Sequence, residues 1–474
     1  MNKILFLNPP LTIQERYGSL ASAGAMEPPH GLTYLASVLR EAGWDTQILD
    51  AEALRLSDKE TVERIVSISP DILACTAVTL SIQRAAVVAA AVKERCPAIT
   101  TIIGGVHLTS QPHETMTLFP CFDYGVIGEG ERTLAELGAA LSDNLDTRRI
   151  QGVVSRDGER VHQAPLRPFI KELDTLPMPA WDLLPPLARH YYLAPQSIQN
   201  TPSTSLITSR GCTGHCIFCD TSVFKNVCRA HSAEYVVDMI RTLYHRFGIR
   251  EILFEDDNFM LFHRRLQRLT ELIPREGNSI SWSCLARADM MPDPSVLNAM
   301  RRAGCWQILI GIESGCQEIL DFEKKGITLE QIEDAVRRAR DCGMKTKGFL
   351  MVGHPMETVE TIERTLQFVT RLPLDDISVT FFTVFPGAPI WKEASRYGRV
   401  IAEFSKMSVF HPTFIPEGLT AEKLEQYMRH ILKRFYLRPR IVLSYLRRIR
   451  SWRQMVALLK GAFALLARLF RTHV

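Results

Sequence analysis

The chain has 474 residues, of which 46% are hydrophobic and 23% are charged. This composition is that of a globular protein with two or three domains, and it excludes a disordered or collagen-like chain. The net charge of +4 hides an asymmetry, because residues 426–474 contain twelve Lys or Arg and no Asp or Glu. The rest of the chain is acidic overall. We therefore expect no nucleic-acid partner, since phosphate binding requires a basic face on a folded domain.

The first residues predict a strand rather than a signal peptide. The apolar run at 4–7 is too short for a signal sequence and leads into Asn8-Pro9-Pro10. No apolar stretch approaches the ~18 residues that a membrane span requires. Eleven cysteines, an odd number, favour a reducing compartment over a disulfide framework. These features predict a cytoplasmic protein.

In residues 1–145, short apolar runs alternate with helical patterns. This alternation is typical of a doubly wound, Rossmann-like α/β domain, in which helices cover both faces of a parallel sheet. The predicted strands are 4–7, 46–49, 72–76, 100–103 and 124–127, and the predicted helices are 32–42, 61–67, 82–95 and a helix from 133. Glycine-bearing loops follow the last two strands, at residues 104–107 and 128–131. Such loops bind ligands in this architecture.

Residues 146–200 show a hairpin pattern around Asp157-Gly158 and then a proline-rich run, Leu176-Pro177-Met178-Pro179-Ala180. They predict a linker between domains. A second series of alternating strands and helices fills residues 201–400. Six strands indicate a partial (βα)6 barrel, because a closed barrel of this type has eight. The strands are expected at 205–209, 251–255, 279–285, 306–312, 345–352 and 376–382.

Three of the cysteines, Cys212, Cys216 and Cys219, share one short loop directly after the first strand of the barrel. Thiolates bind zinc or iron–sulfur clusters. A structural zinc site normally has four protein ligands, whereas three cysteines leave one iron of a [4Fe–4S] cluster open to a substrate. The loop therefore favours a cluster. A zinc site completed by His215, or simply buried thiols, is the alternative.

The spacing Cys-x-x-x-Cys-x-Phe-Cys, with Phe218 before the last cysteine, resembles the signature of the radical S-adenosylmethionine (SAM) enzymes. The resemblance implies that the three cysteines bind three irons of a [4Fe–4S] cluster and that SAM chelates the fourth. It also implies that the reduced cluster cleaves SAM to a 5′-deoxyadenosyl radical. An external electron donor of the flavodoxin or ferredoxin type would supply the electron.

Other polar residues of the barrel resemble the residues that bind SAM in this family. In chain order, the resemblance assigns Glu255, Asp256 and Asp257 to the amino group, Arg287 to the carboxylate, and Glu313 and Ser314 to the ribose hydroxyls. The loop at 348–353, with Glu357, resembles the loop near adenine. The alternative for each residue is a charged or polar group that caps a strand or a helix.

The domain order resembles the cobalamin (B12)-binding subclass of radical SAM proteins, which includes methyltransferases and an oxidative cyclase. The segment Pro29-His30-Gly31-Leu32 and the loop at 104–107 carry the same resemblance. It implies that cobalamin binds to residues 1–145 through Thr76, Thr79, Gly104, Gly105, His107, Gly128 and Gly130. The Asp-x-His-x-x-Gly motif of other cobalamin domains is absent, so we expect no histidine on cobalt. His107 is the alternative ligand, and a domain without cobalamin is the alternative to binding.

Residues 401–474 predict a helical region that ends in a basic amphipathic tail. Apolar residues from Leu443 to Phe470 recur at helical spacing among arginines and a lysine. Such a helix can bind an anionic membrane surface, which would place the active site near a lipid substrate. A helix docked on the acidic body of the protein is the alternative.

These features together predict a cobalamin-dependent radical SAM enzyme that methylates an unactivated carbon, or phosphorus, of a small-molecule or lipid substrate. In this interpretation one SAM methylates cobalamin and a second generates the radical that abstracts a hydrogen atom. One alternative is a radical cyclisation, oxidation or rearrangement without methyl transfer. The other is a cobalamin sensor or carrier.

Overall fold

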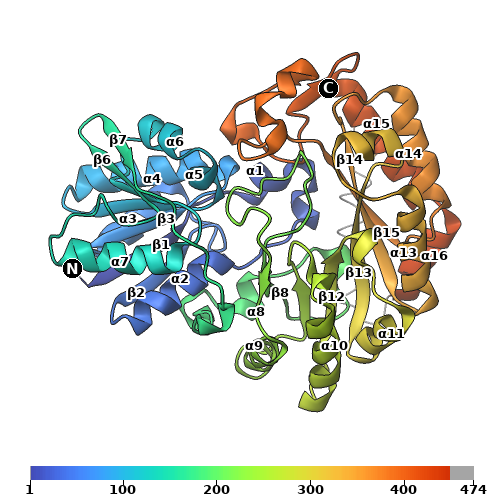
Figure 1. Ribbon diagram of the computed structural model, residues 1–474, viewed down its shortest axis with the longest axis horizontal. Helices are drawn as coiled ribbons and strands as arrows, with labels where there is room; N and C mark the ends of the chain where they lie inside the picture. The colour runs from blue at the N-terminus through green and yellow to red at the C-terminus, as the bar shows by residue number, and fades with distance from the viewer. Residues whose placement is uncertain (1, 449–474) are drawn as a thin grey trace.

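The computed structural model describes residues 2–448 as two α/β domains that lie side by side (Figure 1). The first domain is the blue half of the chain in Figure 1, and the second is an open half-barrel that runs from green to orange. A long ordered segment and a C-terminal region connect them. The predicted fold class, a doubly wound domain followed by a partial barrel, is confirmed.

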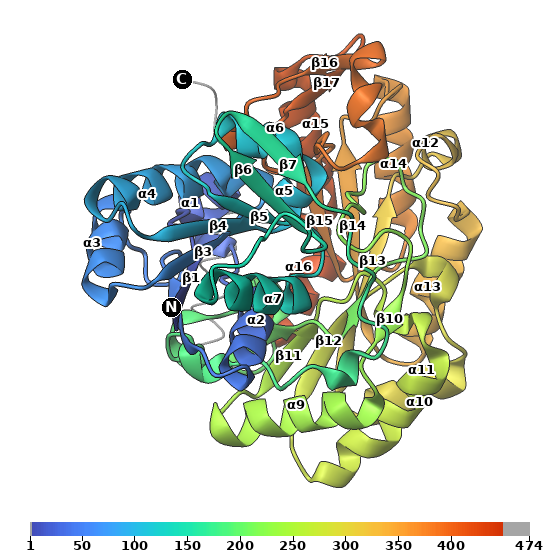
Figure 2. The same cartoon turned by 60° about the vertical axis from the view of Figure 1, so that its left-hand side comes forward.

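Five parallel strands carry the apolar runs of the first domain. They are β1 (Lys3–Asn8), β2 (Asp45–Asp50), β3 (Ile72–Thr76), β4 (Thr100–Gly104) and β5 (Tyr124–Val126), in the order β2-β1-β3-β4-β5. The strands are apolar on both sides because helices cover both faces. Figure 2 shows α2 (His30–Glu41) and α7 (Gly130–Ser142) on one face, away from α3 (Asp58–Ile68) and α4 (Ile82–Arg95). Each face packs its own hydrophobic core.

The hairpin around Asp157-Gly158 belongs to the first sheet. Its strands, β6 (Val153–Asp157) and β7 (Arg160–Gln163), continue that sheet beyond β5 in antiparallel pairing. The sheet therefore extends past residue 145, where the sequence placed the domain boundary. The sequence pattern revealed the turn, but the pairing of β6 with β5 depends on contacts between distant residues.

The proline-rich segment between the domains is packed against both of them. Trp181 is buried beside Phe247 of the barrel, with ring centroids 6.2 Å apart. Tyr191, just after α8 (Leu187–His190), donates a 2.7 Å hydrogen bond to Asp50 at the end of β2. The predicted linker is therefore in packed contact with both domains.

All six strands predicted for the barrel are present and parallel. They are β8 (Ser203–Leu206), β11 (Glu251–Phe254), β12 (Ser281–Ala286), β13 (Cys305–Glu313), β14 (Lys345–Val352) and β15 (Asp376–Phe381), and they pair in sequence order. The covering helices are α9 (Ala233–Arg246), α10 (His263–Leu272), α11 (Pro294–Arg302), α13 (Leu329–Asp341) and α14 (Val359–Arg371). Helix α13 begins at a capping box, in which Thr328 Oγ1 accepts from Gln331 N and the Gln331 side chain accepts from Thr328 N. Outward-facing strand residues and these helices form the largest core.

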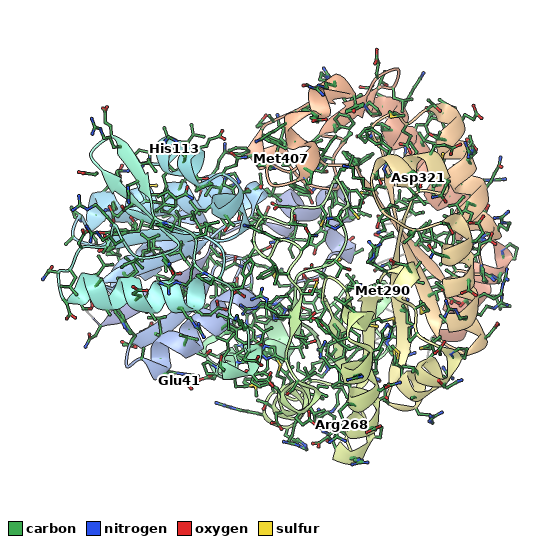
Figure 3. All side chains as sticks on the ribbon, in the orientation of Figure 1. Glu41, His113, Arg268, Met290, Asp321 and Met407 are labelled. Carbon is green, nitrogen blue, oxygen red and sulfur yellow. The ribbon has the colours of Figure 1, made fainter. Side chains whose placement is uncertain are left out.

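After the barrel, residues 401–413 cross back to the first domain. Ser408 Oγ donates a 2.9 Å hydrogen bond to the carbonyl of Arg16, and Phe410 packs on Tyr17 with ring centroids 5.3 Å apart. Figure 3 shows Met407 on this segment at the upper part of the junction between the domains. Met407 is buried, so the two domains share packed contacts here in addition to the segment that joins them.

The C-terminal region continues into α15 (Ala421–Tyr436) and α16 (Pro439–Arg448). Its first basic residues are docked on the barrel, because Arg438 donates to the carbonyl of Thr370 at 2.6 Å and Arg440 to that of Leu374 at 2.7 Å. Most of the predicted membrane-binding tail, residues 449–474, lies outside the described residues. No helix within residues 2–448 is long and apolar enough to span a membrane.

Candidate active site

A cavity of about 230 Å³ opens at the carboxyl edge of the first sheet, where the first domain meets the barrel. The loops after β3, β4 and β5 form one side of it, and Arg210 and Phe224 of the barrel close it. Five of the residues predicted to bind cobalamin line the cavity, namely Thr76, Gly104, Gly105, Gly128 and Gly130. Parallel sheets bind ligands at this edge because the strand order switches there and adjacent loops diverge.

Gly105 has a conformation that only glycine adopts without strain. Its φ is +99°, and a Cβ atom there would lie 2.6 Å from the carbonyl oxygen of Ala77. The loops after β3 and β4 therefore touch through their backbones at this position. At Gly128, which also has a positive φ, no atom lies within 4 Å of the place a Cβ would take. The two glycines let backbone amides approach a bulky ligand such as the tail of cobalamin.

Thr79 and His107 are placed differently from the other predicted residues. They do not line the cavity, and His107 Nδ1 lies 3.2 Å from Thr79 Oγ1. The imidazole packs edge-on against Phe404, with ring centroids 4.7 Å apart. Burial lowers the pKa of His107 to about 4, so the ring is neutral. Packing accounts for its position, and the expectation that no histidine binds cobalt stays a prediction.

The three-cysteine loop follows β9 (Ser209–Arg210) at the carboxyl end of the barrel strands. The sulfur atoms of Cys212 and Cys216 lie 3.5 and 3.7 Å from the Cβ position of Gly214, so both face the same point. Two residues that the sequence did not single out hold the loop. Asn226 Nδ2 donates to the carbonyls of Cys212 and Gly214, and the Ile217 amide donates to the Glu323 carbonyl at 3.0 Å.

Cys216 is the most buried of the three cysteines, with 7% of its surface exposed. Burial raises the pKa of its thiol, while Lys325 and Arg287 act in the opposite direction. Arg287 Nη1 lies 3.9 Å from Cys216 Sγ. These two cations favour the thiolate, which is the form that binds iron. Phe218 packs against Phe382, with ring centroids 6.3 Å apart, and so closes one side of the loop.

The arrangement of side chains alone does not distinguish zinc from a [4Fe–4S] cluster. Among the described residues, no three His, Cys, Asp or Glu side chains are gathered closely enough to hold a single metal ion. Thiolates bind both kinds of centre, and the family of the chain distinguishes them.

Comparison with known proteins identifies the family. The model of the Radical SAM superfamily matches residues 206–369, and that of the B12 binding domain matches residues 18–138. An uncharacterized methyltransferase of Pyrococcus horikoshii is 34% identical over 423 residues, which cover 89% of this chain and 90% of the relative. The chain belongs to the radical SAM superfamily, in the group that carries a B12-binding domain.

Two further comparisons describe the range of this group. An anaerobic magnesium-protoporphyrin IX monomethyl ester cyclase of Cereibacter sphaeroides is 27% identical, and the match covers 92% of this chain and 70% of the cyclase. The structure of the radical SAM methyltransferase TsrM from Kitasatospora setae, with cobalamin and a [4Fe–4S] cluster bound, matches with a TM-score of 0.72 at 17% identity. That match covers 98% of this chain and 100% of TsrM. The family confirms that this protein is a radical SAM enzyme and confirms its cofactors as a [4Fe–4S] cluster, SAM and cobalamin.

The residues predicted to bind SAM divide into two sets. The first set, Asp256, Ser314 and Glu357, forms hydrogen bonds within the protein. Asp256 accepts from Thr208 and Ser209, and Ser314 pairs with Thr365. Glu357 accepts from the amides of Gly353 and His354. The assignment of these three residues to SAM stays a prediction. Their hydrogen bonds brace the loops at the carboxyl end of the radical SAM barrel.

The second set lies at the mouth of the barrel beside the cysteine loop. Arg287 forms a two-pronged ion pair with Asp289, and Lys325 Nζ lies 2.8 Å from Glu313 Oε1. Burial and the neighbouring Glu27 raise the pKa of Glu255 well above its ordinary value, which favours its protonated form. Asp257 is exposed. The assignment of these residues to SAM stays a prediction.

Proposed function

We propose that this radical SAM enzyme methylates an unactivated carbon, or a phosphorus centre, of a small molecule, with SAM as the methyl source. The similarity to a methyltransferase over nine-tenths of both chains supports methyl transfer. The 27% identical cyclase supports the alternative of a radical cyclisation. The cofactors supply a methyl carrier and a hydrogen-abstracting radical, and the protein supplies position and exclusion of water.

The observation that carries the proposal is the meeting of the two cofactor sites at one junction. Arg210 lines the cavity of the B12-binding domain, and only Gly211 separates it from Cys212. Asn226 and Glu323 hold the cysteine loop in place through hydrogen bonds. A substrate between the domains can therefore contact both cofactors, which methyl transfer to a radical requires.

The test is anaerobic turnover of the reconstituted protein with SAM, hydroxocobalamin, a reductant and candidate substrates. We expect two products from SAM, S-adenosylhomocysteine and 5′-deoxyadenosine, with the first strictly dependent on hydroxocobalamin. Formation of 5′-deoxyadenosine and a converted substrate without S-adenosylhomocysteine would establish the cyclase alternative. His107→Ala is the control. Because Thr79 and Phe404 hold His107 away from the cavity, it should leave both products and the cobalamin absorption spectrum unchanged.

We propose an external donor of the flavodoxin or ferredoxin type as the source of the electron. Cys219 is exposed whereas Cys216 is buried, so the cysteine loop reaches the protein surface and a donor can approach it there. We also propose the cytoplasm as the compartment of the enzyme. All eleven cysteines are free in the structure, which suits a reducing environment.

Peripheral membrane association is proposed for the chain beyond Ile441. Val442 and Leu443 of α16 are each 46% exposed, whereas the preceding residues Arg438 and Arg440 are bound to the barrel. Seven basic residues and no acidic ones follow Ile441, and each basic residue near an anionic surface contributes ~1 kcal/mol at most. A membrane-bound tail would place a lipid-like substrate near the active site.

Vesicle flotation tests this proposal. The full chain should float with phosphatidylserine-containing vesicles at low salt and should not float with neutral vesicles. A chain ending at Arg440 keeps α15 and the hydrogen bonds of Tyr436 to Asp376 and Ile377 of the barrel, and it should stay in the soluble fraction with both kinds of vesicle. Equal behaviour of the two chains would mean that the tail packs on the protein, and the argument for a lipid substrate would then fail.

A further inference from the structure

A buried ion cluster links the B12-binding domain to the loop that holds the iron–sulfur cluster. It consists of Glu129 and Glu131, from the loop and first turn after β5, and of Arg210 and Arg229 from the barrel. Arg210 and Arg229 face each other across the short ribbon of β9 and β10 (Arg229–Ala230). All four side chains are at least 89% buried.

The geometry of this ion cluster is specific. Arg210 forks between the two acids, with Nη1 2.6 Å from Glu129 Oε1 and Nη2 2.5 Å from Glu131 Oε1. Arg229 Nη1 lies 2.8 and 2.9 Å from the two carboxylate oxygens of Glu129 and also donates to the carbonyl of Ile170. The planar guanidinium of Arg210 is what allows one side chain to hold two carboxylates.

The connection from Arg210 to the cysteine loop is short and tightly packed. Gly211 alone lies between Arg210 and Cys212, and it has a φ of +85°. A Cβ at Gly211 would lie 2.4 Å from the carbonyl oxygen of Val227. The connection between the ion cluster and the first cysteine is therefore both short and close-packed. A shift of Arg210 must move Cys212, because close-packed segments transmit displacement.

Three buried atoms of the ion cluster lack a hydrogen-bond partner within residues 2–448, namely Arg229 Nε, Arg229 Nη2 and Glu131 Oε2, and of these only the Glu131 atom belongs to a residue that lines the cavity. Glu131 lines the cavity, and its second carboxylate oxygen, Oε2, is buried with no hydrogen-bond partner within residues 2–448. A buried carboxylate oxygen left unsatisfied is costly, so a donor from a ligand in the cavity would be favoured there. Among the ligands of this family, cobalamin carries such donors as amide N–H groups and hydroxyls.

We propose that Glu131 Oε2 accepts a hydrogen bond from cobalamin. Arg210 is then a positioning residue, because its ion pair with Glu131 couples the position of Glu131 to that of the cysteine loop. The proposal rests on the proposed function, because it requires both cofactors. Cobalamin would hold Glu131 in place, and through Arg210 it would fix the position of the cysteine loop beside which SAM binds. Binding of either ligand must therefore strengthen binding of the other by the same factor.

The test is equilibrium dialysis of SAM on the anaerobic protein with its oxidised cluster, in which SAM is not cleaved. For the unmodified protein, hydroxocobalamin should lower the Kd of SAM by about fivefold or more. In Arg210→Lys the positive charge remains but the ammonium cannot fork between two carboxylates. This variant should keep four irons per chain, and the effect of hydroxocobalamin on the Kd of SAM should fall below twofold.

Arg16→Lys is the matched control. Arg16 makes a two-pronged pair with the buried Glu52 in the same domain, with both distances 2.7 Å, but it contacts neither the cavity nor the cysteine loop. The Arg16→Lys variant should therefore retain the full effect of hydroxocobalamin on the Kd of SAM. If Arg210→Lys loses iron, Glu131→Gln decides the question. In Glu131→Gln the ion pair between Arg210 and Glu129 remains. This variant should raise the Kd of hydroxocobalamin several-fold and abolish the effect of hydroxocobalamin on the Kd of SAM.

The outcomes separate this proposal from the proposed function. Full coupling in an Arg210→Lys or Glu131→Gln protein that retains its irons would overturn the proposal. So would hydroxocobalamin uptake by the unmodified protein without any change in SAM affinity, and in that case the proposed function would stand. A protein that takes up no hydroxocobalamin would contradict the proposed function itself.

Discussion

Replacing Cys212, Cys216 and Cys219 by Ala is expected to abolish both the iron–sulfur cluster and the cleavage of SAM. The sulfur atoms of the first two cysteines face one point, and the loop that carries all three is held by Asn226 and Glu323. The triple variant should lose the broad iron–sulfur absorbance, all four irons and all formation of 5′-deoxyadenosine.

Cys228→Ala is the matched control for this variant. Cys228 is a free, partly buried thiol nine residues after Cys219, outside the cysteine motif. The control should keep four irons per chain and form 5′-deoxyadenosine. Retention of four irons by the triple variant would show that the cluster, if present, is bound elsewhere, and the assignment of the loop would be wrong.

Glu323→Gln is expected to destabilise the barrel strongly. Glu323 and His354 are both fully buried, and His354 Nδ1 is hydrogen-bonded to the Glu323 carboxylate. Burial opposes a charge on the imidazole, but Glu323 and then Glu357 outweigh it and raise the pKa of His354 to about 10. Removing one partner of a buried pair leaves the other charge uncompensated and costs about 3–5 kcal/mol of unfolding free energy. Glu357 remains, so the lower end of that range is expected.

The same pair predicts how stability depends on pH. The folded-state pKa of His354, about 10, lies above the ordinary value of about 6.5 for an unfolded chain. Its contribution to stability is therefore complete below about pH 6.5 and is lost as the pH rises through about 10. Unfolding temperatures measured from pH 6 to pH 10 should fall for the unmodified protein, and this fall should be smaller in Glu323→Gln.

Glu318→Gln is the control, because Glu318 also pairs with a cation, Arg364, but on the solvent-exposed surface. Solvent screens that pair, so the change should be slight and should not alter the pH dependence. An unfolding free energy for Glu323→Gln equal to that of the control would contradict the role of the buried pair. Destabilisation around Glu323 in the Glu323→Gln variant would also affect the cysteine loop, because the amide of Ile217 donates a hydrogen bond to the carbonyl of Glu323.

The amino-acid sequence alone was sufficient for the strands and for the placement of the three cysteines on one loop. Strands buried on both faces are continuous apolar runs, so the runs at 72–76 and 345–352 coincide with β3 and β14. The cysteine spacing is equally local, because Cys212, Cys216 and Cys219 lie on one loop. Local patterns of this kind survive folding because neighbours along the chain stay neighbours in space.

The first domain boundary required the tertiary structure. The sequence revealed the turn at Asp157-Gly158, but it placed the hairpin in a linker after residue 145. Tyr124 of β5 pairs with Ser155 of β6, and that pairing determines where the sheet ends. The choice of partner strand depends on the packing of the whole sheet edge, which no window of sequence contains.

The roles of the charged residues were decided by the tertiary structure as well. Asp256 and Asp257 are adjacent in sequence, yet Asp256 is buried against Thr208 while Asp257 is exposed. Arg210 was not singled out, and its partners Glu129 and Glu131 lie 81 and 79 residues away. The sequence determines the residue types and the local elements that carry them. Which carboxylate meets which cation is decided when the domains pack, because the energy of a charge depends on burial and on partners that are distant in the chain.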